Sequence, residues 1–286
     1  MSGPVAGLTA RVLVRRVWDR FETDDVLTRA AAMSFFMIFA LFPAFLLLVA
    51  LVELLPQVEV HDRLLAYPRR VLPPEAAMLV ERTLGQLREG ASTTLLSLGA
   101  GAALRAASSG MVSVINALNV VFRVCEPRPW WRRRLVAVAL TVGLTMFMVT
   151  GLLLVVFGGW LGRALAAATE FGPLVALAWP WLHGLAVIGC VTLGVALVYR
   201  FAPAQALSWR RLAPGAAFAV LAWLIASLGL RLYVVHFQSY NVTYGSIGGV
   251  ILLMLWLFLS NAALLVGAEL NSVIDDMVNE ARARRL

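Results

Sequence analysis

Ionisable and amide side chains stand inside the apolar stretches of this 286-residue sequence. An arginine at membrane depth, such as Arg105, costs at least about 2.5 kcal/mol on insertion scales, so it should face a bundle interior or a watery cavity. A column of such groups would suit the passage of an anionic headgroup or solute. The alternative is that these groups only bind neighbouring helices together. The candidate pathway consists of Arg105, Ser108, Ser109, Asn116, Asn119, Asn261, Glu269 and Asn271.

Distances along the expected helices predict which of these residues can meet. Measured from the external end at 1.5 Å per residue, Asn116 and Asn119 lie at roughly 34–39 Å and Glu269 lies at roughly 37 Å. Arg105 at roughly 18 Å and Asn261 at roughly 25 Å lie nearer the middle of the membrane. We therefore expect the first three side chains to meet near the cytoplasmic face and the other two to approach each other at mid-membrane.

Residues for hydrolytic chemistry are scattered along the chain. Phosphodiester cleavage needs clustered His, Asp and Glu side chains. Asp24 and Asp25 stand alone in the amino tail, and Asp275 and Asp276 lie in the carboxyl tail. No phosphate-cradling loop is present in the sequence. We therefore expect no enzyme activity, no catalytic or metal-binding residues and no cofactor. The histidines are His61, His183 and His236.

Composition identifies the elements that must position these residues. The sequence is 61% hydrophobic and only 14% charged, whereas a soluble domain carries about 25% charged residues. Several apolar runs are long enough to cross a bilayer, and their lack of alternation excludes a β-barrel. We expect an all-α, polytopic transmembrane bundle with short interfacial helices. The transmembrane domain covers residues 30–275, between a cytoplasmic amphipathic tail at 1–29 and a cytoplasmic basic tail at 276–286. Its external loop is expected at 56–92. Its six spans are expected at about 30–55, 93–122, 135–160, 173–199, 212–237 and 244–270.

Arginines predict the orientation of these six spans. The formal net charge is +8, and all 24 basic residues are arginines. They concentrate at the two ends of the chain, at Arg123–Arg134 and at Arg200–Arg211, and these regions alternate with arginine-poor loops at 161–172 and 238–243. Cytoplasmic loops carry such an excess of positive charge. We therefore expect both ends of the chain to be cytoplasmic.

The densest basic cluster reads RVCEPRPWWRRR from Arg123 to Arg134. Basic residues interleaved with aromatic residues can bind single-stranded nucleic acid. Between two apolar runs, however, a cytoplasmic loop on the membrane surface explains them better, and we expect no nucleic-acid partner. The candidate contacts to anionic lipid are Arg128, Arg132, Arg133 and Arg134.

The amino tail contains one expected amphipathic helix. Val14, Val17, Trp18 and Phe21 recur at helical spacing, with arginines mostly on the other faces. Such a helix can lie on an anionic membrane surface, or it can pack against the other spans.

Four pieces of the sequence together resemble the YihY/virulence factor BrkB family. The most specific piece is SYNVTYGSIGGVILLMLWLFLSNAALLVGAELN from Ser239, which begins at a Gly-rich polar turn and ends in GAEL. The others are AAAMSFFMIFALFPAFLLLVAL from Ala30, SSGMVSVINALNVVFRV from Ser108 and PGAAFAVLAWLIASLGLRLYV from Pro214. In order, they cover roughly residues 24 to 272.

The resemblance implies a six-span protein of the bacterial inner membrane, in a family whose members are sometimes mislabelled ribonuclease BN. It carries over no catalytic residues, and Arg105 departs from the uncharged or aromatic residue expected there. We expect a role in transport of a solute, lipid or other amphiphile, or alternatively a non-catalytic role in envelope assembly. The expected partners are membrane lipids and a lipid or amphiphile substrate. The sequence leaves open whether the protein forms a homo-oligomer.

Overall fold

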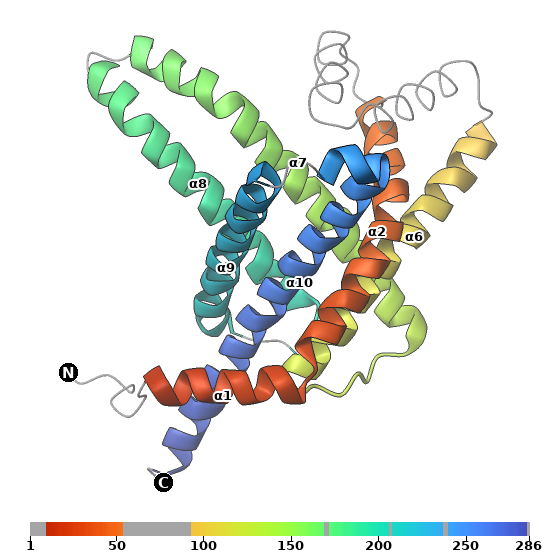
Figure 1. The fold of residues 1–286 in the computed structure, drawn as a ribbon, viewed down its shortest axis with the longest axis vertical. Coiled ribbons are helices and arrows are strands. Elements are labelled where there is room, and N and C mark those ends of the chain that lie inside the picture. Colours follow the sequence, from red (N-terminus) through yellow and green to blue (C-terminus); the bar gives the residue numbers. More distant parts are fainter. Residues whose placement is uncertain (1–9, 54–92, 169–171, 206–207, 237–239, 285–286) are drawn as a thin grey trace. The chain divides into compact units, whose positions relative to one another are not determined.

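The computed structural model describes residues 10–53, 93–168, 172–205, 208–236 and 240–284, and no strand occurs within these ranges. The predicted all-α class is confirmed. The predicted external loop 56–92 lies outside the described residues. The helices are α1 (Ala10–Thr23), α2 (Val26–Glu53), α6 (Thr93–Val121), α7 (Trp130–Ala168), α8 (Gly172–Phe201), α9 (Trp209–His236) and α10 (Tyr240–Ala283) (Figure 1).

Apolar side chains cover the outside of these helices. In the most apolar window of Trp130–Val155 no residue is buried, and large exposed side chains such as Met148 and Trp181 continue along α7 and α8. Contiguous apolar surface of this kind needs a bilayer or a partner to cover it. Within the described residues, four segments are long and apolar enough to cross a membrane: Trp130–Val155, Gly172–Phe201, Arg211–Val234 and Gly248–Ala283. The described apolar segments Val26–Phe39 and Ala107–Val121 are shorter, so six spans stay a prediction.

Two compact units make up the chain. The larger unit joins residues 1–36 to residues 111–286, and the smaller unit comprises residues 37–110. In the larger unit, α10 packs against α9, α8 packs against α7 and α9, and α1 contacts α10 (Figure 1). The last helix therefore connects the amino-terminal helix to the rest of this unit.

Helix α10 is longer than the predicted last span at both ends. It begins at Tyr240, so the Gly-rich residues expected to form a turn are helical instead. It continues to Ala283, so most of the predicted carboxyl tail extends the same helix. This extension beyond Asn271 supplies the surface on which α1 docks.

Helices α9 and α10 approach each other through glycines. A Cβ atom added to Gly267 would lie 2.5 Å from the Gly215 carbonyl oxygen, and one added to Gly215 would lie 2.1 Å from the Gly267 carbonyl oxygen. Asn271 joins the same two helices, because it accepts from the Gly215 N–H at 2.7 Å and donates to the Leu212 carbonyl at 3.0 Å. Small residues allow such backbone contact, and a buried amide reinforces it.

A tight corner turns the chain from α1 into α2. Asp24 and Asp25 donate their backbone N–H groups to the carbonyls of Arg20 and Glu22, which ends α1. Asp25 has a φ of 50°, a left-handed conformation that Asp adopts more readily than most residues. The corner directs the Asp24 side chain back toward α10.

Candidate functional site

Helix α1 faces the extended end of α10 through residues spaced four apart, which lie on one face of a helix. Arg16 donates to both carboxylate oxygens of Glu280, at 2.9 and 3.1 Å. One turn later Arg20 donates to Asp276 and to the Ser272 hydroxyl, the latter at 2.7 Å. These two contacts form the first two rungs of what we call the α1–α10 ladder.

The third rung of the ladder places two acids together. Asp24 lies close enough to Glu269 for the two acids to act on each other, and the Glu269 side chain has no solvent exposure. Both Glu269 carboxyl oxygens and Asp24 Oδ2 are buried, and the described residues offer them no hydrogen-bond partner. Arg20 and Arg123 attract the Glu269 charge from nearby without bonding to it in the described structure. The site therefore holds a buried acidic pair.

A second polar cluster centres on Glu126, in the turn between α6 and α7. Its carboxylate accepts from the Arg128 guanidinium at 2.7 and 3.0 Å, from the Arg128 backbone N–H at 3.2 Å and from the Asn119 amide at 2.7 Å. Arg128 also donates to the Ala202 carbonyl at 3.0 Å, and Asn119 accepts from the Ala204 N–H at 2.9 Å. The cluster fastens the α6–α7 turn to the end of α8.

The pKa of Glu126 reflects this network. Burial is the largest single influence and on its own would raise the pKa. Hydrogen bonds from Arg128 and Asn119, together with the positive charge of Arg128, outweigh burial, and the pKa of Glu126 lies below its ordinary value of 4.5. Glu126 is therefore a carboxylate held in its charged form.

The predicted lipid-contacting arginines fall into different environments. Arg128 is occupied by Glu126 and Ala202. Arg133 donates to the Asn116 side chain at 3.3 Å, and the Arg132 guanidinium lies 5.9 Å from the centre of the Trp131 ring. Arg132 is exposed and Arg134 is half-buried. Lipid binding by all four arginines stays a prediction, and Arg128 also bonds Glu126 and the Ala202 carbonyl.

The predicted pathway residues are divided among separate contacts. Asn261 donates to the buried Ser34 hydroxyl at 2.9 Å and thereby joins α10 to α2. No contact of the described residues joins Asn116 or Asn119 to Glu269, although sequence depth suggested that the three could meet. Arg105, an exposed residue, belongs to the smaller unit, so its approach to Asn261 stays a prediction. Within the smaller unit, the Ser108 and Ser109 hydroxyls both donate to the Arg105 backbone carbonyl at 3.0 Å.

Sequence reasoning missed two residues at the centre of these clusters. Asp24 was expected to stand alone in the amino tail, and Glu126 was seen only as a member of a basic loop. The four-residue spacing of Arg16, Arg20 and Asp24 could have indicated an interacting face. Its acidic counterpart in the carboxyl tail was visible too, but the pairing between the two ends was not.

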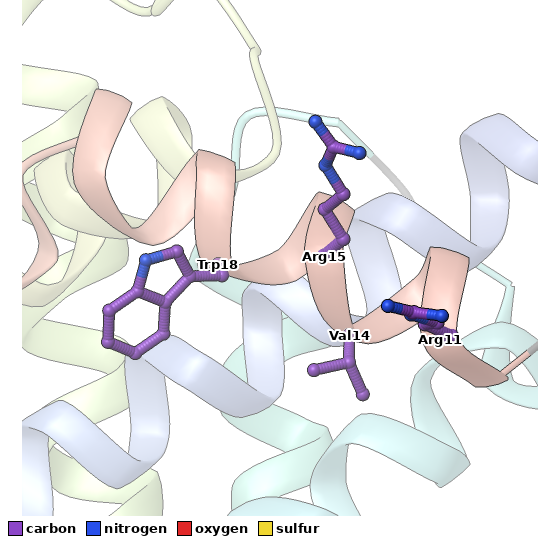
Figure 2. Close-up of a pocket in the computed structure, with 4 residues that line it drawn as sticks. All are labelled: Arg11, Val14, Arg15 and Trp18. Atoms are coloured by element: carbon purple, nitrogen blue, oxygen red, sulfur yellow. The ribbon is translucent and has the colours of Figure 1, made fainter.

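The face of α1 away from the ladder combines arginines with apolar side chains. Val14 and Trp18 are 67% and 60% exposed. With Arg11 and Arg15 they line a surface pocket, where Figure 2 shows Arg15 directed away from Val14. Helix α1 therefore does pack against another span, through its Arg16 and Arg20 face. Its contact with an anionic membrane surface, through the opposite face, stays a prediction.

The exposed apolar helices and the polar contacts between them define a helical integral membrane protein. The chain belongs to the virulence factor BrkB family, whose model matches residues 17–285. No solved structure matches it.

Individual relatives agree with this family. The chain is 32% identical over 262 residues to YfkH of Bacillus subtilis (strain 168), a protein whose name describes it as ribonuclease-like, and the match covers 91% of this chain and 94% of YfkH. It is 30% identical over 272 residues to the UPF0761 membrane protein Smlt0865 of Stenotrophomonas maltophilia (strain K279a), covering 90% of this chain and 59% of that protein. It is 28% identical to the UPF0761 membrane protein xcc-b100_3490 of Xanthomonas campestris pv. campestris (strain B100), covering 95% and 63%. The chain thus spans about three fifths of the length of these UPF0761 proteins.

Proposed function

We propose that this protein takes part in moving a lipid, solute or other amphiphile across or within the bacterial inner membrane. The observation that carries the proposal is Glu269, a fully buried carboxyl group in the last apolar helix that finds no hydrogen-bond partner among the described residues. Ionisable groups at membrane depth are costly and commonly mark a substrate or ion pathway. A pathway that begins at Glu269 would open toward the arginines of the cytoplasmic end.

The proposed orientation has six spans with both ends in the cytoplasm. The contact between α1 and the extended end of α10 supports it, because it brings the amino- and carboxyl-terminal helices to the same side. The arginines of the two termini and of the Arg123–Arg134 turn supply the positive charge expected of cytoplasmic segments.

A non-catalytic role in envelope assembly is the second candidate. Asn119, Asn261 and Asn271 each bond a neighbouring segment, as expected of amides that bind helices together. We propose a non-enzymatic role in either case. The two described histidines, His183 and His236, each hydrogen-bond a backbone carbonyl of a helix. The ribonuclease-like wording in the name of YfkH describes that protein.

Reconstitution separates transport from assembly. The full chain is incorporated into vesicles of phosphatidylcholine and phosphatidylglycerol that carry a fluorescent phosphatidylglycerol analogue, and translocation is followed by chemical quenching of the outer leaflet. We expect protein-dependent translocation that Glu269→Gln slows at least about tenfold, equivalent to about 1.4 kcal/mol in the barrier. The matched control is Glu280→Gln, the same change on the same helix. Translocation that is absent, or equally fast in Glu269→Gln, would favour the assembly role.

A further inference from the structure

We propose that Asp24 and Glu269 form a proton-binding site, in which the two carboxyl groups share one proton across the third rung of the α1–α10 ladder. The site deepens the proposed function, because a proton bound there is an ion to which transport can be coupled. Its existence can nevertheless be tested without any transported substrate.

The charge pattern of the ladder leads to this site. The first two rungs pair a base of α1 with an acid of α10, Arg16 with Glu280 and Arg20 with Asp276. Four residues after Arg20, in the corner that follows α1, Asp24 lies opposite Glu269, another acid, which precedes Asp276 by seven residues (276 − 269). A positive charge is therefore missing at the one rung where the α10 side chain is fully buried.

Three arginines of neighbouring elements lie near the pair. Arg29 of α2 donates to the Asp24 backbone carbonyl at 2.7 Å. Arg20 of α1 donates to Asp276 and Ser272. Arg123, two residues after the end of α6, also attracts the Glu269 charge and is itself exposed. In the described structure none of the three arginines donates a hydrogen bond to Glu269. Two ionised carboxylates are acceptors only and would repel each other, whereas one shared proton turns the same contact into a hydrogen bond.

A proton suits the site better than a metal ion does. Two carboxyl groups are enough to hold one proton, while Ca²⁺ takes six to eight oxygen ligands and Mg²⁺ takes six. Among the residues that the structure describes, no three His, Cys, Asp or Glu side chains gather as a metal site would require. The geometry therefore favours the smallest cation.

Release of the proton would act on the attachment of α1. Two negative charges at the third rung would push the corner at Asp24 away from α10. A bound proton would keep the corner at Asp24 in contact with α10. Occupancy of the site would therefore be linked to the position of the amino-terminal helix.

Infrared spectroscopy of the full-length protein in phosphatidylcholine nanodiscs tests the site directly. At neutral pH we expect the carbonyl stretch of a protonated carboxyl group, and we expect it to disappear as the pH rises and to be missing in Glu269→Gln. In Asp24→Asn the band and its titration should shift, since Glu269 then faces an amide. Glu280→Gln and Asp25→Asn, which change an acid of the first rung and the exposed neighbour of Asp24, should leave the band unchanged.

Several results would overturn the proton site. They are a wild-type spectrum without the band, a band that survives Glu269→Gln, and a titration identical in wild type and Asp24→Asn. Loss of the band on adding sodium chloride at constant pH would instead indicate a metal cation. Because no substrate is present, a failure here is distinguishable from a failure of lipid translocation, which would leave the infrared band intact.

Discussion

Replacing Glu126 with glutamine should loosen the turn between α6 and α7. The carboxylate accepts four hydrogen bonds on two oxygens, two on Oε1 from Arg128 and two on Oε2 from Arg128 and Asn119. A glutamine has one acceptor oxygen, and its amide group would face donors at the other position. At least two of the four hydrogen bonds are therefore lost, and one of them comes from a charged donor.

The size of the effect follows from those two bonds. A hydrogen bond involving a charged group contributes about 1.5–3 kcal/mol and a neutral one about 1 kcal/mol. Arg128 retains the Ala202 carbonyl as an acceptor, and the side chains of both Glu126 and Arg128 are 17% exposed, so water recovers part of the loss. We expect a destabilisation of about 2 kcal/mol, or about 4–8 °C in Tm by the scaling for soluble domains.

The dependence on pH gives an independent check of the same network. The pKa of Glu126 is lowered in the folded protein, so its stabilising contribution is fully present above the ordinary carboxyl pKa of 4.5 and is lost as the pH falls through the lower, folded value. The difference in Tm between wild type and Glu126→Gln should therefore stay constant near neutral pH and shrink only in acid.

Thermal unfolding in detergent, followed by circular dichroism from acid to neutral pH, measures both quantities. Glu22→Gln is the matched control, because it makes the same change at an exposed position of α1. If Glu126→Gln melts with the wild type at neutral pH, or if the difference between them is unchanged in acid, the argument for a charged and fully bonded Glu126 is wrong.

Three further predictions concern packing, transport and lipids. Gly267→Ala should cost about 1–3 kcal/mol in stability by overpacking the α9–α10 contact, measured by Tm against Gly229→Ala, whose added Cβ meets no atom within 4 Å. If the protein is a transporter, Arg105→Leu should abolish translocation while the protein still folds, as judged by an unchanged Tm. If it has an assembly role, the same variant should keep its function. Neutralising Arg132 and Arg133 with glutamine should lower the phosphatidylglycerol that co-purifies with the protein, measured by lipid mass spectrometry.

Much of the helical organisation follows from the sequence because a bilayer imposes it. Long apolar runs must form helices in hydrocarbon, and α7, α8, α9 and α10 cover the stretches that hydropathy assigned to spans. Helix ends were less predictable. Nothing in hydropathy indicates that α10 continues beyond Asn271, because its continuation is polar and depends on α1 lying beside it.

The site was predictable residue by residue and not pair by pair. Glu269 and Asn119 stood out from their types and their depth in the membrane. Depth fixes only the position along a helix axis, whereas a contact also requires two side chains to face each other around their axes. Asn119 thus bonds Glu126 and the Ala204 N–H, while Glu269 faces Asp24, which is 245 positions away by subtraction of the two residue numbers.

The unequal exposure of the three rungs decides which of them controls the docking of α1. In the first rung both side chains are exposed, Arg16 at 40% and Glu280 at 48%, and in the second rung Asp276 is 47% exposed. Ion pairs that water reaches contribute little to stability. A buried carboxylate without a donor costs much more than such a pair returns. The charge state of the third rung therefore outweighs the other two, and a single proton at Asp24 and Glu269 would determine whether the amino-terminal helix stays on the last span.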